Sequence, residues 1–165
     1  MDPVPMIVDE SDLVRWGRRI GESIQGPAFI GLRGPLGAGK SVLARAVAEG
    51  AGVEDSMPSP TFNLLFRYET SDGIRIVHLD LYRLEEPEEL WELGWEELGA
   101  DDEVVLVEWP ERAGNLLPTD RWEIELSLPE PEVQVEGRRE DYRRVGVSRY
   151  GSPPHLPGFP VRVER

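Results

Sequence analysis

One glycine-rich stretch of this chain has the residue types and the spacing needed to hold a phosphate group. Residues 34–41 read GPLGAGKS and fit the pattern G-x-x-x-x-G-K-[ST]. Lys40 within them is the only lysine of the chain, whose other Lys/Arg positions are all arginines. A compact ammonium on a flexible stem can reach anionic oxygens inside a ring of backbone amides, whereas a guanidinium is bulkier and favours two-pronged contacts. The position of the single lysine therefore predicts a phosphate-binding loop.

The neighbours of Lys40 fit a triphosphate that carries magnesium. A helix N-terminus offers unpaired N–H groups and partial positive charge, and glycines let the backbone curl with those groups turned inward. The Ser41 hydroxyl can bind Mg²⁺. Guanine-specific P-loop proteins read their base through an N-K-x-D motif, which needs a second lysine, so ATP is favoured. The residues predicted to bind the nucleotide are Gly34, Gly37, Ala38, Gly39, Lys40, Ser41 and Val42. A chance match at a glycine-rich turn is the competing interpretation.

Three further polar residues could complete a site that hydrolyses ATP. Thr61 in SPTF either caps backbone in a proline turn or contacts Mg²⁺ or the γ-phosphate from a mobile loop. Asp80 ends a strand-like run and either caps the next turn or binds Mg²⁺. Glu108 ends the apolar run VVLV, as in the Walker-B pattern, and can orient Mg²⁺ or a hydrolytic water. The predicted catalytic residues are Lys40, Asp80 and Glu108, and the predicted metal ligands are Ser41, Thr61, Asp80 and Glu108.

Two aromatic or titratable neighbours of these acids carry weaker signals. His78 precedes Asp80 by two residues and shares its side of the strand. We interpret His78 as structural, because one histidine lacks the partners that a metal site requires. Trp109 follows Glu108 and either stacks near the base or packs in the core, and the local sequence favours neither role.

The predicted elements place these residues at strand ends and at the start of a helix. An apolar run at 28–32 predicts a buried strand before the loop, and 40–49 predicts a helix after it. The other expected elements are a helix at 11–24, a hairpin of strands at 63–70 and 73–80, a helix at 86–98, and strands at 104–109, 121–128 and 141–150. This order predicts an α/β fold, a helix-covered sheet with antiparallel additions.

The expected helix at 86–98 carries an apolar stripe. Helical spacing would put Leu90, Trp91, Leu93, Trp95 and Leu98 on roughly one face. We interpret this stripe as core packing rather than as a cofactor-binding surface.

Charge is distributed unevenly along the 165 residues, which suffice for one compact domain. The formal net charge is −14, yet residues 138–165 hold seven arginines against three acids. We divide the chain into a P-loop ATPase domain, 1–137, and a basic, proline-rich C-terminal extension, 138–165, partly ordered at best. The acidic body repels phosphate backbones, so tight nucleic-acid binding by the chain alone is not expected. The chain has no cysteine, no apolar run long enough for a membrane span and no signal-peptide pattern, which favours the cytoplasm.

Four motifs in this order and spacing resemble the bacterial TsaE family. They are GxLGAGKS, SPTF, HLDLYRL with a following PEEL, and LVEWPER, and the similarity covers roughly residues 10–128. The departures are small: Pro35 replaces an acid common at that position, and Ser41 stands where threonine is common. The resemblance implies a P-loop fold with a mixed sheet, in which Thr61 belongs to a switch-like loop, Asp80 and Glu108 are essential acids, and Trp109 lies near the nucleotide.

The resemblance also implies a function. TsaE proteins bind ATP and Mg²⁺ and act with TsaB and TsaD to make N6-threonylcarbamoyladenosine in tRNAs that read ANN codons. TsaD transfers the threonylcarbamoyl group, which TsaC supplies as an adenylate. ATP hydrolysis by TsaE, slow alone and stimulated by its partners, would sustain the TsaB–TsaD cycle.

Two alternatives use the same loop. One is a small-molecule kinase, although no clear lid segment lies between 85 and 103. The other is a non-catalytic adaptor that binds ATP only to set its shape. Arg83 and Arg112 are the nearest candidates for a cation that steadies transition-state charge.

Overall fold

A mixed β-sheet forms the centre of the molecule. Within residues 6–54 and 64–158, which this computed structural model describes, seven strands pair in the order β1-β7-β6-β2-β5-β4-β3. Their bounds are β1 (Met6–Asp9), β2 (Ala28–Arg33), β3 (Leu65–Glu69), β4 (Arg75–Asp80), β5 (Glu103–Glu108), β6 (Arg121–Ser127) and β7 (Tyr142–Tyr150).

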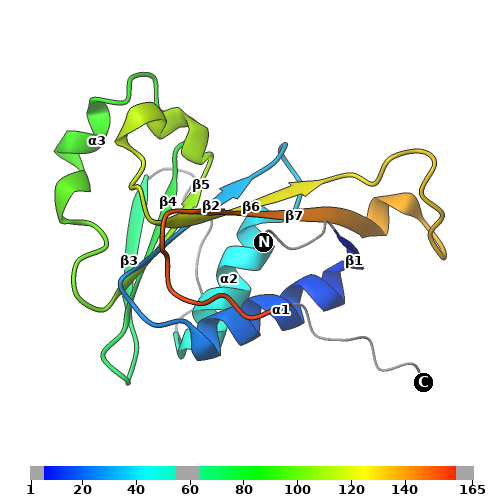
Figure 1. The fold of residues 1–165 in the computed structure, drawn as a ribbon, viewed down its shortest axis with the longest axis horizontal. Helices are drawn as coiled ribbons and strands as arrows, with labels where there is room; N and C mark the ends of the chain where they lie inside the picture. Colours follow the sequence, from blue (N-terminus) through cyan, green and yellow to red (C-terminus); the bar gives the residue numbers. More distant parts are fainter. Residues whose placement is uncertain (1–5, 55–63, 159–165) are drawn as a thin grey trace.

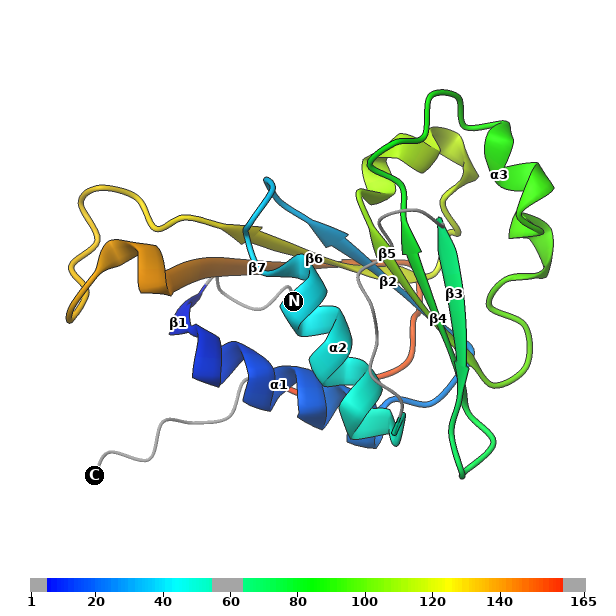
Figure 2. The ribbon, with the colours of Figure 1, turned by 180° about the vertical axis from the view of Figure 1, so that it is seen from behind.

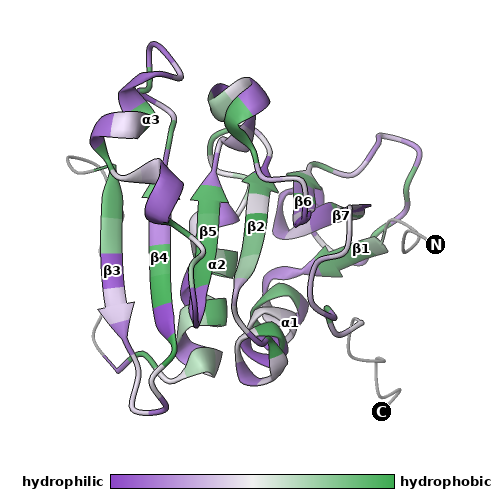
Figure 3. Ribbon diagram, turned by 60° about the vertical axis from the view of Figure 1, so that its left-hand side comes forward, coloured by the Kyte–Doolittle hydropathy of each residue, from purple (hydrophilic) through white to green (hydrophobic). Residues whose placement is uncertain are grey.

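The interior of this sheet is parallel. β2 pairs in parallel with β5 and β6, and β4 pairs in parallel with β5. β3 and β7 run antiparallel to their neighbours at either side. Both faces of the parallel strands are covered, which is why β5 reads as a nearly unbroken apolar run; Figure 3 shows its hydrophobic colouring. The mixed α/β fold expected from the sequence is confirmed.

Two helices cover one face of the sheet. α1 (Glu10–Ser23) and α2 (Lys40–Ala51) lie side by side there, as Figures 1 and 2 show. α1 begins with a capping box between Asp9 and Asp12. The helices approach so closely that a Cβ atom at Gly21 would lie 1.9 Å from the carbonyl oxygen of Val47. This contact fixes α2 and therefore the loop at its N-terminus.

The opposite face is covered by short turns rather than by the long helix expected at 86–98. That segment forms α3 (Glu89–Glu92) and the 3₁₀ turn η1 (Trp95–Glu97), separated by Gly94 with φ 76°. A left-handed glycine ends a helix, so the prediction of one continuous helix is wrong. The stripe is also only partly buried, because Leu90 and Trp95 pack in the core whereas Trp91 is 45% exposed. The 3₁₀ turns η2 (Pro110–Leu116) and η3 (Arg139–Asp141) complete the described elements.

The C-terminal segment is built into the fold. β7 pairs with β6 on one side and with β1 on the other. The residues after it also contact the body, since the indole N–H of Trp16 donates to the Pro157 carbonyl at 2.8 Å and that of Trp122 to the Pro154 carbonyl at 2.7 Å. The boundary that the sequence suggested at 137/138 thus falls in the connection between two paired strands. Charge and proline content distinguished this segment in the sequence, whereas in the structure its residues Tyr142–Tyr150 form β7, in which Val145 and Val147 are buried.

None of the helices in the described stretches has both the length and the apolar character to cross a membrane.

Candidate functional site

A cavity of about 460 Å³ opens at the carboxyl ends of the parallel strands. Ligands of α/β proteins collect at this edge. The cavity is lined by most of the residues that the sequence singled out: Gly37, Ala38, Gly39, Lys40, Ser41, Val42, Asp80, Glu108 and Trp109. Gly34 does not line the cavity, but its carbonyl oxygen accepts a hydrogen bond from the Lys40 ammonium. Thr61 lies outside the described residues. Leu36, Leu64 and Tyr82 line the cavity without having been predicted. Of the two candidate transition-state cations, Arg83 lines the cavity and Arg112 does not.

The loop that joins β2 to α2 adopts a conformation that depends on glycine. Gly34 has φ 141°, and a Cβ atom there would lie 2.2 Å from the Leu126 carbonyl oxygen. Gly39 has φ 105° and is the N-cap of α2 without a side-chain hydrogen bond to the first turn. The N–H groups of that turn therefore remain for a ligand, and an uncapped helix start favours an anion.

Lys40 is held inside the loop. Its Nζ atom donates to the carbonyl oxygens of Gly34 at 2.5 Å and Pro35 at 2.8 Å, and it lies 4.4 Å from the centre of the Trp109 ring. Burial lowers the pKa of Lys40, and the negative charges of Glu108, Asp80 and Glu111 oppose that shift. A desolvated cation with carbonyl partners is placed to exchange them for phosphate oxygens.

Glu108 is the centre of a buried hydrogen-bond network. The Ser41 hydroxyl lies 3.0 Å from Oε1 and 3.2 Å from Oε2 of Glu108. The Nε2 atom of His78 lies 2.7 Å from Oε2, and His78 and Glu108 are 1% and 3% exposed. An ionised carboxylate only accepts, so the imidazole N–H is the donor. The sequence indicated that His78 is structural. In the structure His78 orients the carboxylate of Glu108.

Asp80 lies beside Glu108 on the neighbouring strand. The two residues are register partners of β4 and β5, which brings both carboxylates to the same sheet edge. Burial raises the pKa of Asp80, and the hydrogen bond from the Tyr82 backbone N–H to Oδ1, 3.0 Å, acts against that rise. Both interpretations of Asp80 find support here, because it caps the following turn and also lines the cavity.

Trp109 forms one wall of the cavity. Its backbone is left-handed, with φ 60°, and its N–H donates to the Leu32 carbonyl at 3.2 Å. The Tyr82 ring centre lies 5.0 Å from that of Trp109. The indole therefore lies between the Lys40 ammonium and the Tyr82 ring, and it also packs against the edge of the core.

The fold and the site together define an α/β protein of the P-loop NTPase type. The model of one family, described as "Threonylcarbamoyl adenosine biosynthesis protein TsaE", matches residues 7–138. The chain belongs to this TsaE family, and the resemblance seen in its motifs is confirmed.

Curated relatives and a solved structure agree with this assignment. The tRNA threonylcarbamoyladenosine biosynthesis protein TsaE of Haemophilus influenzae is 36% identical over 117 residues, covering 68% of this chain and 73% of the relative. The protein of the same name from Treponema pallidum is 33% identical over 129 residues, covering 78% and 90%. The crystal structure of Bacillus subtilis YdiB has a TM-score of 0.68 at 23% identity, covering 92% of this chain and 88% of that one, which shows a shared fold.

Proposed function

We propose that the chain is an ATP-binding and ATP-hydrolysing subunit that acts with TsaB and TsaD in threonylcarbamoyladenosine modification of tRNAs reading ANN codons. The observation that carries this proposal is the convergence of Lys40, Ser41, Asp80 and Glu108 on one cavity at the carboxyl edge of the parallel strands. The printed names of the relatives support the biosynthetic role.

The donor atoms around the cavity fit Mg²⁺ and a triphosphate. The Ser41 hydroxyl and the carboxylates of Asp80 and Glu108 supply oxygen ligands, which Mg²⁺ prefers. In the part of the chain that the structure describes, no group of three or more His, Cys, Asp or Glu could hold a metal by itself. This agrees with an ion held by one or two carboxylates together with phosphate. The Ser41 hydroxyl and the carboxylates of Asp80 and Glu108 would hold Mg²⁺, which would supply positive charge against the negative charge of the phosphates.

Each side chain has a distinct task in this proposal. The Lys40 ammonium binds phosphate oxygens, and the first-turn N–H groups of α2 add fixed dipoles. Glu108 orients the attacking water, and His78 and Ser41 hold its carboxylate in one position. Trp109 limits the access of bulk water to the ammonium.

Partner stimulation follows from the shortage of cations at the site. Among the described lining residues, only Lys40 and Arg83 are cationic, and Arg83 is exposed. An exposed, flexible arginine stabilises transition-state charge poorly until a neighbouring surface fixes it. We therefore expect slow hydrolysis by the chain alone and faster hydrolysis with TsaB and TsaD. The net charge of −14 argues against tRNA retention without those partners.

The test combines binding, hydrolysis and modification. Calorimetry with MgATP is expected to show binding by the wild-type chain and by Glu108→Gln, and none by Lys40→Met. ADP release is expected from the wild type only, and to rise when TsaB and TsaD are added. Reconstitution with TsaB, TsaD, TsaC, tRNA, threonine, bicarbonate and ATP then counts modification turnovers.

Two outcomes would replace the proposal. Many modification turnovers with Glu108→Gln, in the absence of hydrolysis, would make the chain an ATP-binding adaptor. ADP release that depends on a small-molecule acceptor would make it a kinase.

A further inference from the structure

One arginine outside the family-matched stretch 7–138 contacts the phosphate-binding loop from behind. Arg143 lies in β7, 105 residues after Ala38 in the chain. Its Nε atom donates to the Ala38 carbonyl oxygen at 2.9 Å, and its Nη2 atom donates to the Gly37 carbonyl oxygen at 3.1 Å. Two neighbouring loop carbonyls thus share one rigid guanidinium fork.

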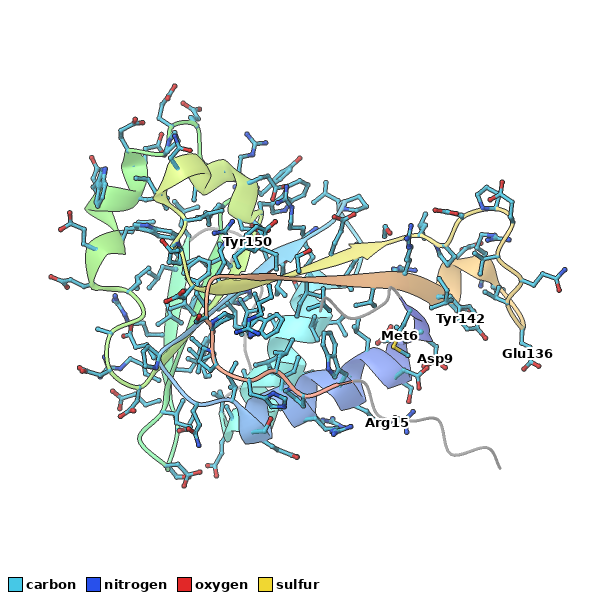
Figure 4. The ribbon with its side chains drawn as sticks, viewed as in Figure 1. Met6, Asp9, Arg15, Glu136, Tyr142 and Tyr150 are labelled. Atoms are coloured by element: carbon cyan, nitrogen blue, oxygen red, sulfur yellow. The ribbon has the colours of Figure 1, made fainter. Side chains whose placement is uncertain are left out.

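The guanidinium is itself held in place. Its Nη1 atom donates to the carbonyl oxygens of Glu140 at 2.6 Å and Tyr142 at 2.8 Å. Arg143 is also the register partner of Val8, and Asp9 pairs with Tyr142 beside it; Figure 4 labels these last two at the end of the sheet. Arg143 is paired with β1, and the pairing of β7 with β6 begins at the next residue, Arg144, so the fork projects from a strand rather than from a loop.

The loop separates two cavities. Gly37, Ala38, Gly39 and Val42 line the nucleotide cavity and also a second cavity of about 410 Å³, which Arg143 lines from the opposite side. The Ala38–Gly39 peptide is trans, so its C=O and N–H point in opposite directions. With the C=O bound to Arg143, the N–H of Gly39 points away from the guanidinium, and Gly39 itself lines the nucleotide cavity. A hydrogen bond to the C=O also polarises the N–H of the same peptide and strengthens it as a donor.

We propose that Arg143 is a positioning residue of the nucleotide site, which fixes the loop so that the N–H of Gly39 faces the phosphates. The N–H of the other bonded peptide, that of Ala38, donates to the Pro35 carbonyl at 3.1 Å and holds the loop turn. This inference rests on the proposed binding of MgATP to the loop. Arg143 touches no nucleotide; it acts through the backbone of Gly37 and Ala38. Its sequence neighbour Arg144 is a matched control, because its Nη1 atom pairs with Glu130 at 3.0 Å and both side chains are substantially exposed.

The test compares Arg143→Met, Arg143→Lys and Arg144→Met in the full chain. Calorimetry with MgATP is expected to show a Kd raised about tenfold in Arg143→Met, from the loss of charge-assisted hydrogen bonds behind the loop. Arg143→Lys is expected to fall between Arg143→Met and the wild type, because an ammonium lacks the fork that serves both carbonyls. Arg144→Met is expected to stay within about twofold of the wild type.

Amide hydrogen exchange without nucleotide supplies a readout that a general loss of stability would not reproduce. Arg143→Met is expected to speed exchange at Ala38, whose N–H donates to the Pro35 carbonyl at 3.1 Å, while β4 keeps its wild-type protection. Unchanged MgATP affinity together with faster exchange throughout the sheet would overturn the proposal. Arg143 would then only stabilise β7 in the sheet. Should Arg143→Met fail to fold, Arg143→Lys decides by the same two measurements.

Failure of the proposed function would look different. In that case the wild type would not bind MgATP, or Lys40→Met would bind it equally well, whatever the behaviour of Arg143→Met.

Discussion

The imidazole of His78 and the carboxylate of Glu108 form a buried pair, with 2.7 Å between Nε2 and Oε2, on the neighbouring parallel strands β4 and β5. The Ser41 hydroxyl meets the same carboxylate from α2. Side chains from three elements thus meet at one acid, and protein groups alone orient its carboxylate. Preorganised groups of this kind stabilise developing charge without reorganisation during the reaction.

The pair predicts different effects for two substitutions of His78. In His78→Gln the side-chain amide can still donate to Glu108, whereas His78→Leu leaves a buried carboxylate oxygen without that donor. We expect His78→Leu to lower the free energy of unfolding by about 1–3 kcal/mol, and His78→Gln to lower it by less. Urea denaturation measures both. If catalysis uses Glu108 as proposed, kcat for ATP falls more in His78→Leu while KM changes little. Equal unfolding free energies and equal kcat in the two variants would contradict this role.

The confinement of the Lys40 ammonium predicts that arginine cannot replace it. Carbonyl oxygens lie 2.5 Å and 2.8 Å from Nζ, and the Trp109 ring closes another side. We expect Lys40→Arg to weaken MgATP binding at least about tenfold, because the larger planar group does not fit this space. Calorimetry measures the loss. The reverse exchange at an exposed site of the same helix, Arg45→Lys, is the control and is expected to leave affinity unchanged.

Burial of Asp80 predicts a pH-dependent gain of stability on neutralising it. Burial raises its pKa above the ordinary 3.8, so the folded protein bears the cost of the charge above the raised pKa and is relieved of it as the pH falls through that value. We expect Asp80→Asn to melt at a higher temperature than the wild type near pH 7.5, with a difference that shrinks under acidic conditions. Thermal unfolding across this pH range checks it. A wild type that melts higher than Asp80→Asn at pH 7.5 would show that the charge is stabilising.

Two loop glycines predict unequal costs for the same added methyl group. At Gly37, with φ 78°, a Cβ atom meets nothing within 4 Å, so only backbone strain of about 1 kcal/mol is expected in Gly37→Ala. At Gly34 the Cβ atom would also collide with the Leu126 carbonyl, and we expect Gly34→Ala to cost about 3 kcal/mol. Chemical denaturation compares the two. A smaller loss for Gly34→Ala than for Gly37→Ala would show that the described loop geometry is wrong.

Local patterns predicted the parts of the structure that local chemistry determines. The glycine-rich loop before α2, α2 itself and the apolar strand β5 follow from glycine spacing and hydrophobic runs, and they lie where the sequence placed them. The expected helix at 86–98 was wrong. The helical spacing of apolar residues continues across Gly94, but the left-handed backbone of Gly94 ends the helix there.

Contacts between distant residues were not predictable in this way. His78 and Glu108 meet because β4 and β5 pair in one particular register, which no local pattern specifies. The hydrogen bonds from Arg143 to the loop are still harder to predict from sequence, because they depend on the position of β7 in the strand order. The local sequence also left two roles open for Trp109. In the structure its backbone is left-handed and its ring centre lies 4.4 Å from the Lys40 Nζ atom, a position that no local pattern specifies.

The interior position of β7 has a practical consequence for how this protein is shortened. A chain that ended at residue 138 would keep every residue of the family-matched stretch but would lack β7. In the described sheet β1 would then have no partner strand, and the edge of β6 that pairs with β7 would be exposed. Exposed strand edges recruit other chains, so the shortened protein would self-associate instead of behaving as a minimal unit. The stretch that the family model matches is therefore shorter than the part of the chain that folds as one sheet.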